Sequence, residues 1–331
     1  MVSAFTLLLL TASPEVALLS SSGSTGELRF QPIDAAGLTA PVVRFSHAEG
    51  SPVLGTLLPG TRVVMASAVM KSEGDVSFGS ALIRLESGKP ARLLADQLVY
   101  GSRPLVTSEG RVFVSRGRAG NGHPDEARID ELTVDEIDPR SAKTRTLYST
   151  RGFFTFLVGA LGREVLIYEV TPTTSRLIAV HADSLGVRVL LENMKLPAHD
   201  FVVDAPRKRV LFTQLTDQQS YAVKEVSVIN GEVRVLATGP EITLLPAVRA
   251  DGRVMISKGQ GLGLISLDGS EGLAAQGTGF ERVGVEREGF LIDLHERPSD
   301  FPSLFLFKGA QKYSVTTPRD SRLDVAGVTN P

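Results

Sequence analysis

The sequence predicts an all-β fold in which a unit of four antiparallel strands is repeated around a closed ring. Two stretches, "PLVTSEGRVFVSRG" from Pro104 to Gly117 and "PAVRADGRVMISKG" from Pro246 to Gly259, align without a gap. Weaker copies lie between and outside them, and helical periodicity of any length is missing. A repeat of about 45 residues that supplies four short strands matches one blade of a β-propeller.

Each copy begins with a turn, commonly containing Gly or Pro, that leads into a short apolar run. This order is typical of a tight reversal that feeds a strand. The first apolar residues of these runs, which we call the anchors, are Val16, Val63, Val112, Val165, Val210, Val254 and Phe290. We expect every anchor in the second strand of its blade. The anchors therefore predict a single seven-bladed β-propeller of four-stranded antiparallel blades.

No linker or change of composition divides the chain, so we expect one domain over 1–331. The predicted blades are 4–46, 47–97, 98–152, 153–193, 194–239, 240–279 and 280–318, with a tail over 319–331. The apolar run Phe5–Leu10 is predicted to be the first strand of blade one, and the remnant of a secretory signal is the alternative. A two-sheet sandwich does not explain the sevenfold period, and the coils of a β-helix are much shorter.

Composition excludes several classes of function. Lys plus Arg number 35 and Asp plus Glu 37, so no global field favours nucleic acid or an anionic membrane surface. Cysteine is absent, which excludes disulfides, thiolate metal sites and thiol nucleophiles. The longest apolar run is far shorter than the roughly 18 residues that span a bilayer. We therefore expect a soluble chain with no nucleic-acid partner and no membrane insertion.

The units "TSEGRVFVS…ELTVDEIDPRSAKTRTLY" and "RADGRVMIS…GLISLDGSEG" resemble the WD-repeat-like units of TolB-like and prolyl-oligopeptidase-type propellers. In those repeats a turn ending in Asp-Gly-Arg precedes an apolar strand, and an Asp-Gly turn follows the next strand. The resemblance covers Phe5 to Pro318 and concerns architecture; the third and sixth blades keep the acid-Gly-Arg turn, and Trp is absent. It favours the bacterial periplasm or cell surface over the cytoplasm.

Propellers bind ligands at the mouth of the central channel, on loops from several blades. The connectors between blades and the loops joining second to third strands share one face, and polar residues gather there. The predicted binding residues are His47, Arg103, Arg116, Arg118, His123, His199, Asp200, Lys258, His295, Glu296, Arg297 and Asp300. We interpret them as a mixed-charge rim that docks a polar partner or an acidic ligand. A merely solvated loop face is the alternative.

Motifs for catalysis and cofactors are missing. The sequence contains no G-x-S-x-G nucleophile elbow, no P-loop and no H-E-x-x-H zinc helix. The acidic stretch around Asp125, Glu126 and Asp130 could hold calcium, but a solvated edge that discourages strand aggregation is favoured. The sequence therefore predicts no catalytic residue, no metal and no cofactor.

These observations favour a non-catalytic binding or scaffold propeller that engages a protein partner through its rim loops. Two alternatives stay open. One is a propeller enzyme of the lactonase, lyase or glycoside hydrolase type, which needs acids or histidines converging on the channel mouth from several blades. The other is the propeller module of a larger hydrolase.

Overall fold

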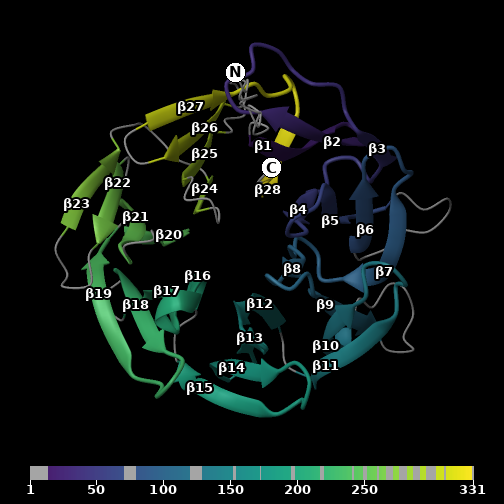
Figure 1. The fold of residues 1–331 in the computed structure, drawn as a ribbon. Helices are drawn as coiled ribbons and strands as arrows, with labels where there is room; N and C mark the ends of the chain where they lie inside the picture. The colour runs from purple at the N-terminus through teal and green to yellow at the C-terminus, as the bar shows by residue number, and fades with distance from the viewer. Residues whose placement is uncertain are drawn as a thin grey trace, which may run out of the picture.

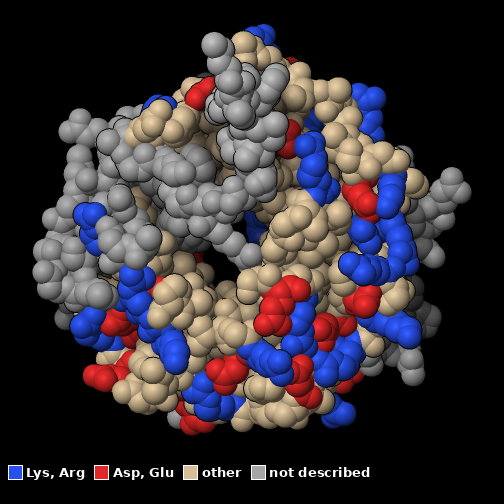
Figure 2. Space-filling model, in the orientation of Figure 1, with Lys and Arg blue, Asp and Glu red and all other residues tan. Residues whose placement is uncertain are grey.

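The computed structural model describes residues 14–70, 80–119, 129–151, 154–171, 173–194, 198–216, 220–240, 242–248, 252–258, 261–265, 271–275, 282–285, 291–295, 303–308 and 311–329. Apart from one 3-10 turn, Ala205–Arg207 (η1), the regular structure in these ranges is all β-strand. The strands form a ring around a central opening (Figure 1), and Figure 2 shows the hollow at its centre. Within the described ranges, no helix is long and apolar enough to cross a membrane.

Five sheets in this part of the chain have four strands each. The strands of each sheet are given in spatial order from one edge to the other. The first sheet is β28 (Arg322–Thr329), β1 (Glu15–Ser22), β2 (Thr25–Pro32) and β3 (Val43–Ser46), and another is β12 (Phe154–Leu161), β13 (Glu164–Val170), β14 (Ser175–His181) and β15 (Val187–Met194). The remaining three are β16 (Ala198–Asp204), β17 (Arg209–Leu215), β18 (Tyr221–Ser227) and β19 (Val233–Gly239); β20 (Ile242–Val248), β21 (Val254–Lys258), β22 (Gly261–Ile265) and β23 (Glu271–Ala275); and β24 (Arg282–Val285), β25 (Leu291–His295), β26 (Ser303–Lys308) and β27 (Gln311–Val315).

The sixth sheet has eight strands. One half is β4 (Leu54–Leu57), β5 (Val63–Ala68), β6 (Ser80–Glu86) and β7 (Arg92–Leu98); the other is β8 (Leu105–Val106), β9 (Val112–Ala119), β10 (Ile129–Ile137) and β11 (Thr144–Thr150). A single register pair, Leu98 with Arg116, joins β7 to β9. If the halves are two blades, the described strands form seven groups of four. Because the two halves share hydrogen bonds, the blade count and the predicted blade limits stay predictions.

The anchors lie where the repeat predicts. Those that the structure describes are in β1, β5, β9, β13, β17 and β21, and each of these strands is the second of its group. The seventh anchor, Phe290, lies outside the described residues. The turn before an anchor strand explains the acid-Gly-Arg pattern, because Gly110 and Gly252 have φ values of 79° and 89°, which favour glycine.

The arginine after that glycine ties strands and sheets together. Arg111 donates to the Glu136 carboxylate of β10, with an Nε to Oε1 distance of 2.7 Å, and to Asp183 of the next sheet at 3.2 Å. Arg209, the first residue of β17, occupies the same place before its anchor Val210, although Lys208 precedes it instead of glycine. Arg209 pairs with Glu225 of β18 and donates to the carbonyl oxygen of Gly252, in the turn before β21 of the next sheet, at 2.8 Å. The repeated arginine is therefore a connector between neighbouring strands and neighbouring sheets.

The core lies between successive sheets. In β1, Ala17 and Leu19 pack against residues of β5 and β6, whereas Val16 and Leu18 pack against β26 on the other side. Side chains alternate between the two faces of a strand, and here both faces are covered, which explains why the second strands read as continuous apolar runs. Each fully buried Leu or Val contributes about 1.5 to 3 kcal/mol relative to an exposed one.

The ring closes through the C-terminal strand. β28 pairs with β1 in antiparallel register from Glu15 with Thr329 to Ser21 with Arg322. The prediction of a tail over 319–331 is therefore wrong, because Arg322–Thr329 is the innermost strand of the first sheet. The run Phe5–Leu10, predicted for that position, lies outside the described residues. The first and last described strands thus pair in one sheet.

Candidate functional site

The channel mouth is formed by strands that begin at one end of the ring. β12 and β16 are the innermost strands of their sheets and border the central opening (Figure 1). In an antiparallel meander, alternate loops lie at the same end, so β12, β16 and β18 all begin at the end that carries the predicted binding face. Four side chains near these beginnings, Phe156, His199, Asp200 and Tyr221, are here called the channel-mouth cluster.

A histidine and an aspartate form the polar part of this cluster. The register of β16 against β17 shifts between His199 and Val202, as in a β-bulge, and Asp200 has φ of 54°. Bulges of this kind redirect side chains next to binding sites. Nδ1 of His199 donates to the Asp200 carboxylate, and the two side chains are 47% and 34% exposed. This hydrogen bond raises the pKa of His199, although partial burial opposes the rise. The pair can therefore present an imidazolium beside a carboxylate.

Aromatic rings join the two sheets that carry the cluster. Phe156 stacks on Tyr168, its cross-strand partner, at 6.3 Å between ring centroids, and Tyr168 packs on Phe201 of β16 at 4.7 Å. The Tyr168 hydroxyl accepts a hydrogen bond from the amide of Ala198 at 3.0 Å, which fixes the start of β16. Phe156 itself is 45% exposed. An aromatic ring held on a rigid strand yet open to solvent is suited to bury against a partner.

Tyr221 completes the cluster. It lies in β18, the third strand of the sheet that also contains His199. Its ring meets the His199 imidazole edge to face at 5.9 Å. The channel-mouth cluster thus combines an exposed apolar ring with a charged pair, contributed by two adjacent sheets.

His47 is one of the predicted binding residues that the structure takes away from the surface. It lies in the connector from β3 to β4, where the sequence placed it, but its side chain is only 1% exposed. Its Nδ1 lies 2.7 Å from the carbonyl oxygen of Ala48, and its ring packs near Phe45. The expectation that His47 contacts a partner is therefore wrong, because backbone hydrogen bonds from His47 to Ser24 and from Ala48 to Val69 hold the connector in place with the imidazole buried.

Arg103 and Arg116 are engaged in ion pairs within the protein. Arg103 lies in the connector from β7 to β8 and donates hydrogen bonds to the buried Asp324 carboxylate of β28 from both terminal nitrogens. The distances are 2.5 Å from Nη2 to Oδ1 and 2.9 Å from Nη1 to Oδ2. Arg116 of β9 pairs with the fully buried Asp135 of β10 at 3.0 Å and with Asp96 of β7 at 2.8 Å. Both arginines therefore connect parts of the ring, and Arg116 is not the freely exposed residue that the sequence predicts.

For the other predicted binding residues the structure gives at most the strand in which each residue lies. Arg118, Lys258 and His295 lie in β9, β21 and β25, at or near the ends of these strands. His123, Glu296, Arg297 and Asp300 lie outside the described residues, as do Asp125 and Glu126 of the possible calcium loop; Asp130 lies in β10. Across the described part of the chain, no three His, Asp or Glu side chains are close enough to hold a metal ion.

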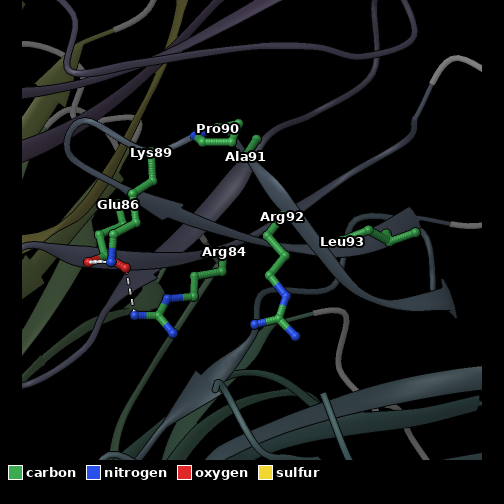
Figure 3. A pocket seen from close by; sticks show the side chains of 7 residues that line it. All are labelled: Arg84, Glu86, Lys89, Pro90, Ala91, Arg92 and Leu93. Carbon is green, nitrogen blue, oxygen red and sulfur yellow. Dashed lines mark hydrogen bonds and ion pairs between the residues drawn. The ribbon is translucent and has the colours of Figure 1, made fainter. Parts of the chain in front are cut away.

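Sequence reasoning missed Phe156, Tyr221 and a basic pocket formed by Arg84, Lys89 and Arg92. The pair of Phe156 with Tyr168 follows from the register of β12 on β13, which the repeat pattern does not specify. The basic pocket lies at the opposite end of the strands, in the β6 to β7 hairpin (Figure 3). Its only signal in the sequence is the close spacing of these three cations in "RLESGKPAR".

Comparison with known proteins finds similarity in structure only. No family model matches the chain, and no curated protein matches it in sequence. Solved structures do match. TolB from Acinetobacter baumannii has a TM-score of 0.53 and 10% identity over 95% of this chain and 66% of its own. A structure of prolyl endopeptidases has 0.60 and 10% over 94% and 50%. Oligogalacturonate lyase from Vibrio parahaemolyticus has 0.55 and 12% over 89% and 86%.

The fold is a β-propeller. The match to TolB and to prolyl endopeptidases agrees with the resemblance seen in the repeat units. At these identities the likeness concerns the fold alone, and fold does not define function. The chain spans about two thirds of TolB and half of the endopeptidase. The matched structures include a lyase and peptidases as well as TolB, so the function has to be argued from the site.

Proposed function

We propose that this propeller is a non-catalytic binding protein that engages a protein partner at the channel mouth. The observation that supports this most directly is the 45% exposure of Phe156 on an innermost strand, in the sheet next to the one that carries His199 and Asp200. Aromatic side chains are enriched at the centres of protein interfaces, and polar groups surround them at the rim. The ring offers an apolar contact, and the charged pair offers a donor and an acceptor to the partner's polar groups.

The loops that the sequence assigns to the same face belong to the same proposal. Lys258 and His295 are the last residues of β21 and β25, and Glu296, Arg297 and Asp300 come after His295 in the sequence, so on the loop assignment from the sequence they extend the binding face. They supply charges of both signs, which steer association and select partners more than they add affinity.

The proposal is tested by affinity capture from the native cell with three matched baits. They are the wild-type protein, Phe156→Ser, and Ile229→Ser as control, because Ile229 is 72% exposed in the β18 to β19 turn at the opposite end of the strands. A protein captured by wild type and by Ile229→Ser, with at least about tenfold loss for Phe156→Ser, supports the proposal. Equal capture by all three baits contradicts it.

A catalytic alternative is favoured by one observation, the contact between His199 and Asp200 at the channel mouth. A histidine oriented by a carboxylate is a common general acid or base. Turnover of lactone or acidic oligosaccharide substrates that falls about 100-fold or more in His199→Gln, with capture unchanged, would favour an enzyme over a binding protein.

A further inference from the structure

A pocket of about 510 Å³ lies at the end of the strands opposite to the channel mouth. It is formed by the end of β6, the turn that follows and the start of β7 (Figure 3). Arg84, Glu86, Lys89 and Arg92 line it together with Pro90, Ala91 and Leu93. Figure 2 shows Lys and Arg side chains gathered over this part of the ring. The pocket thus contains three cations and one carboxylate.

Two of the cations are direct cross-strand partners. Arg84 of β6 is in register with Arg92 of β7, and Figure 3 shows both side chains extending to the same side of the hairpin. Like charges directly opposite each other in a sheet repel and destabilise the pairing. Both guanidinium groups are nevertheless held in place, because Arg84 donates to the carbonyl oxygen of Pro139 at 3.0 Å and Arg92 to that of Arg140 at 2.6 Å.

Glu86 neutralises only part of this charge. Its carboxylate receives Arg84 at 2.6 Å and Lys89 at 2.5 Å. The hydrogen bond from Lys89 contributes most to lowering the pKa of Glu86, so the carboxylate stays ionised at neutral pH. Arg92 has no carboxylate partner among the described residues. The pocket therefore has an excess of positive charge that is concentrated on the Arg92 side.

Hydrogen-bond donors in the pocket are also incompletely used. Nε of Arg84 is buried and has no acceptor within the described part of the chain. Arg92 has five N–H groups, and Nη1 makes the hydrogen bond to Arg140. Fixed guanidinium groups with spare N–H donors match the oxygens of a phosphate or carboxylate group, which they bind through paired hydrogen bonds.

We propose that this pocket binds an oxyanion group, phosphate or carboxylate, between Arg92, Arg84 and Lys89. The anion relieves the repulsion of the cross-strand arginines and accepts hydrogen bonds from the donors that Arg92 leaves unused. Pro90 and Ala91 give the pocket an apolar wall against which the remainder of an organic anion packs. This site is separate from the channel mouth, so it stands independently of the proposed function.

The test uses three probes that carry the same ring: phenyl phosphate, benzoate and the neutral benzamide. Binding is followed by NMR signals of the arginine Nε–H groups in the whole protein. Binding of phenyl phosphate or benzoate with movement of the Arg84 and Arg92 signals supports the site, and the probe that binds more tightly identifies the anion. Absence of binding by both anions, or equal binding of benzamide, overturns the proposal.

Matched variants separate this site from a general charge effect. Arg92→Gln is expected to weaken anion binding about tenfold or more, as expected for losing a hydrogen bond from a charged donor. Arg44→Gln removes the same charge from β3, where Arg44 is 69% exposed and pairs with Glu27, and is expected to change the affinity less than about twofold. Equal losses in the two variants contradict a built site.

Discussion

Replacing Arg103 is expected to destabilise the ring, although the sequence places this residue in a solvated connector. Its guanidinium grips Asp324 of β28 and also donates to the carbonyl oxygen of Gly55 in β4. The amide of Gly55 donates to the same Asp324 carboxylate at 2.8 Å. One side chain thus connects the closing strand, the first strand of the next group and the connector before β8.

The magnitude follows from burial. The Asp324 side chain is 3% exposed, and Arg103→Gln leaves it with one charged partner fewer. Removing one partner of a buried ion pair costs about 3 to 5 kcal/mol. Arg103 is 42% exposed, so water replaces part of the interaction and about 2 to 3 kcal/mol is expected. With about 2.1 cal/mol/K of unfolding entropy per residue, this lowers Tm by about 3 to 4 °C.

The assay is equilibrium denaturation of wild type, Arg103→Gln and the control Arg151→Gln, because Arg151 is exposed and its replacement is expected to change stability by less than about 0.5 kcal/mol. A cycle that adds Asp324→Asn measures the coupling, expected at about 1 kcal/mol or more. If Arg103→Gln lies within about 0.5 kcal/mol of wild type, the argument that Arg103 holds the ring closed is refuted.

Two further predictions concern the channel mouth and the closure. NMR titration is expected to show that the pKa of His199 lies above its usual value and that this pKa falls in Asp200→Asn. Because the folded-state pKa is raised, the pair stabilises the protein fully at pH values below the unfolded-state pKa of the histidine. This stabilisation is lost as the pH rises through the folded-state pKa. An unchanged pKa in Asp200→Asn contradicts the assignment. Deleting 319–331 removes β28 with its buried Leu323 and Val328 and is expected to abolish cooperative thermal unfolding; a truncated monomer that melts near the parent temperature contradicts the closure.

The architecture could be predicted from the sequence because the apolar anchors recur in every unit of the repeat. An anchor such as Val112 has to be apolar wherever its strand is covered on both faces, and this requirement appears in the sequence at every unit. The strand that closes the ring, β28, could not be predicted in the same way. β28 pairs with β1 across nearly the whole chain, and a pairing at that separation leaves no local pattern. The apolar run Phe5–Leu10 offered an inner strand for the first unit, so the sequence provided no reason to look for one at the other end.

The candidate site was only partly predictable because residue type indicates a loop but not the direction of a side chain. His47 lies in its predicted connector, yet its ring is buried. Arg116 is near the predicted face, yet ion pairs with Asp135 of β10 and Asp96 of β7 hold its side chain against the sheet. His199 is where the sequence placed it and stays exposed because a bulge redirects the start of β16. These differences come from register and bulges, which composition and spacing do not specify.

The most direct test of the proposed function is photocrosslinking in the native cell with a benzophenone amino acid at one of two positions. Position 156 lies in the channel-mouth cluster, and position 229 is an exposed control at the opposite end of the strands. We predict a discrete adduct with a protein partner from position 156 and none from position 229, since contact with the reactive group requires the partner to lie on the channel mouth. An adduct from position 229 with none from position 156 would contradict the assignment of the channel mouth as the binding site.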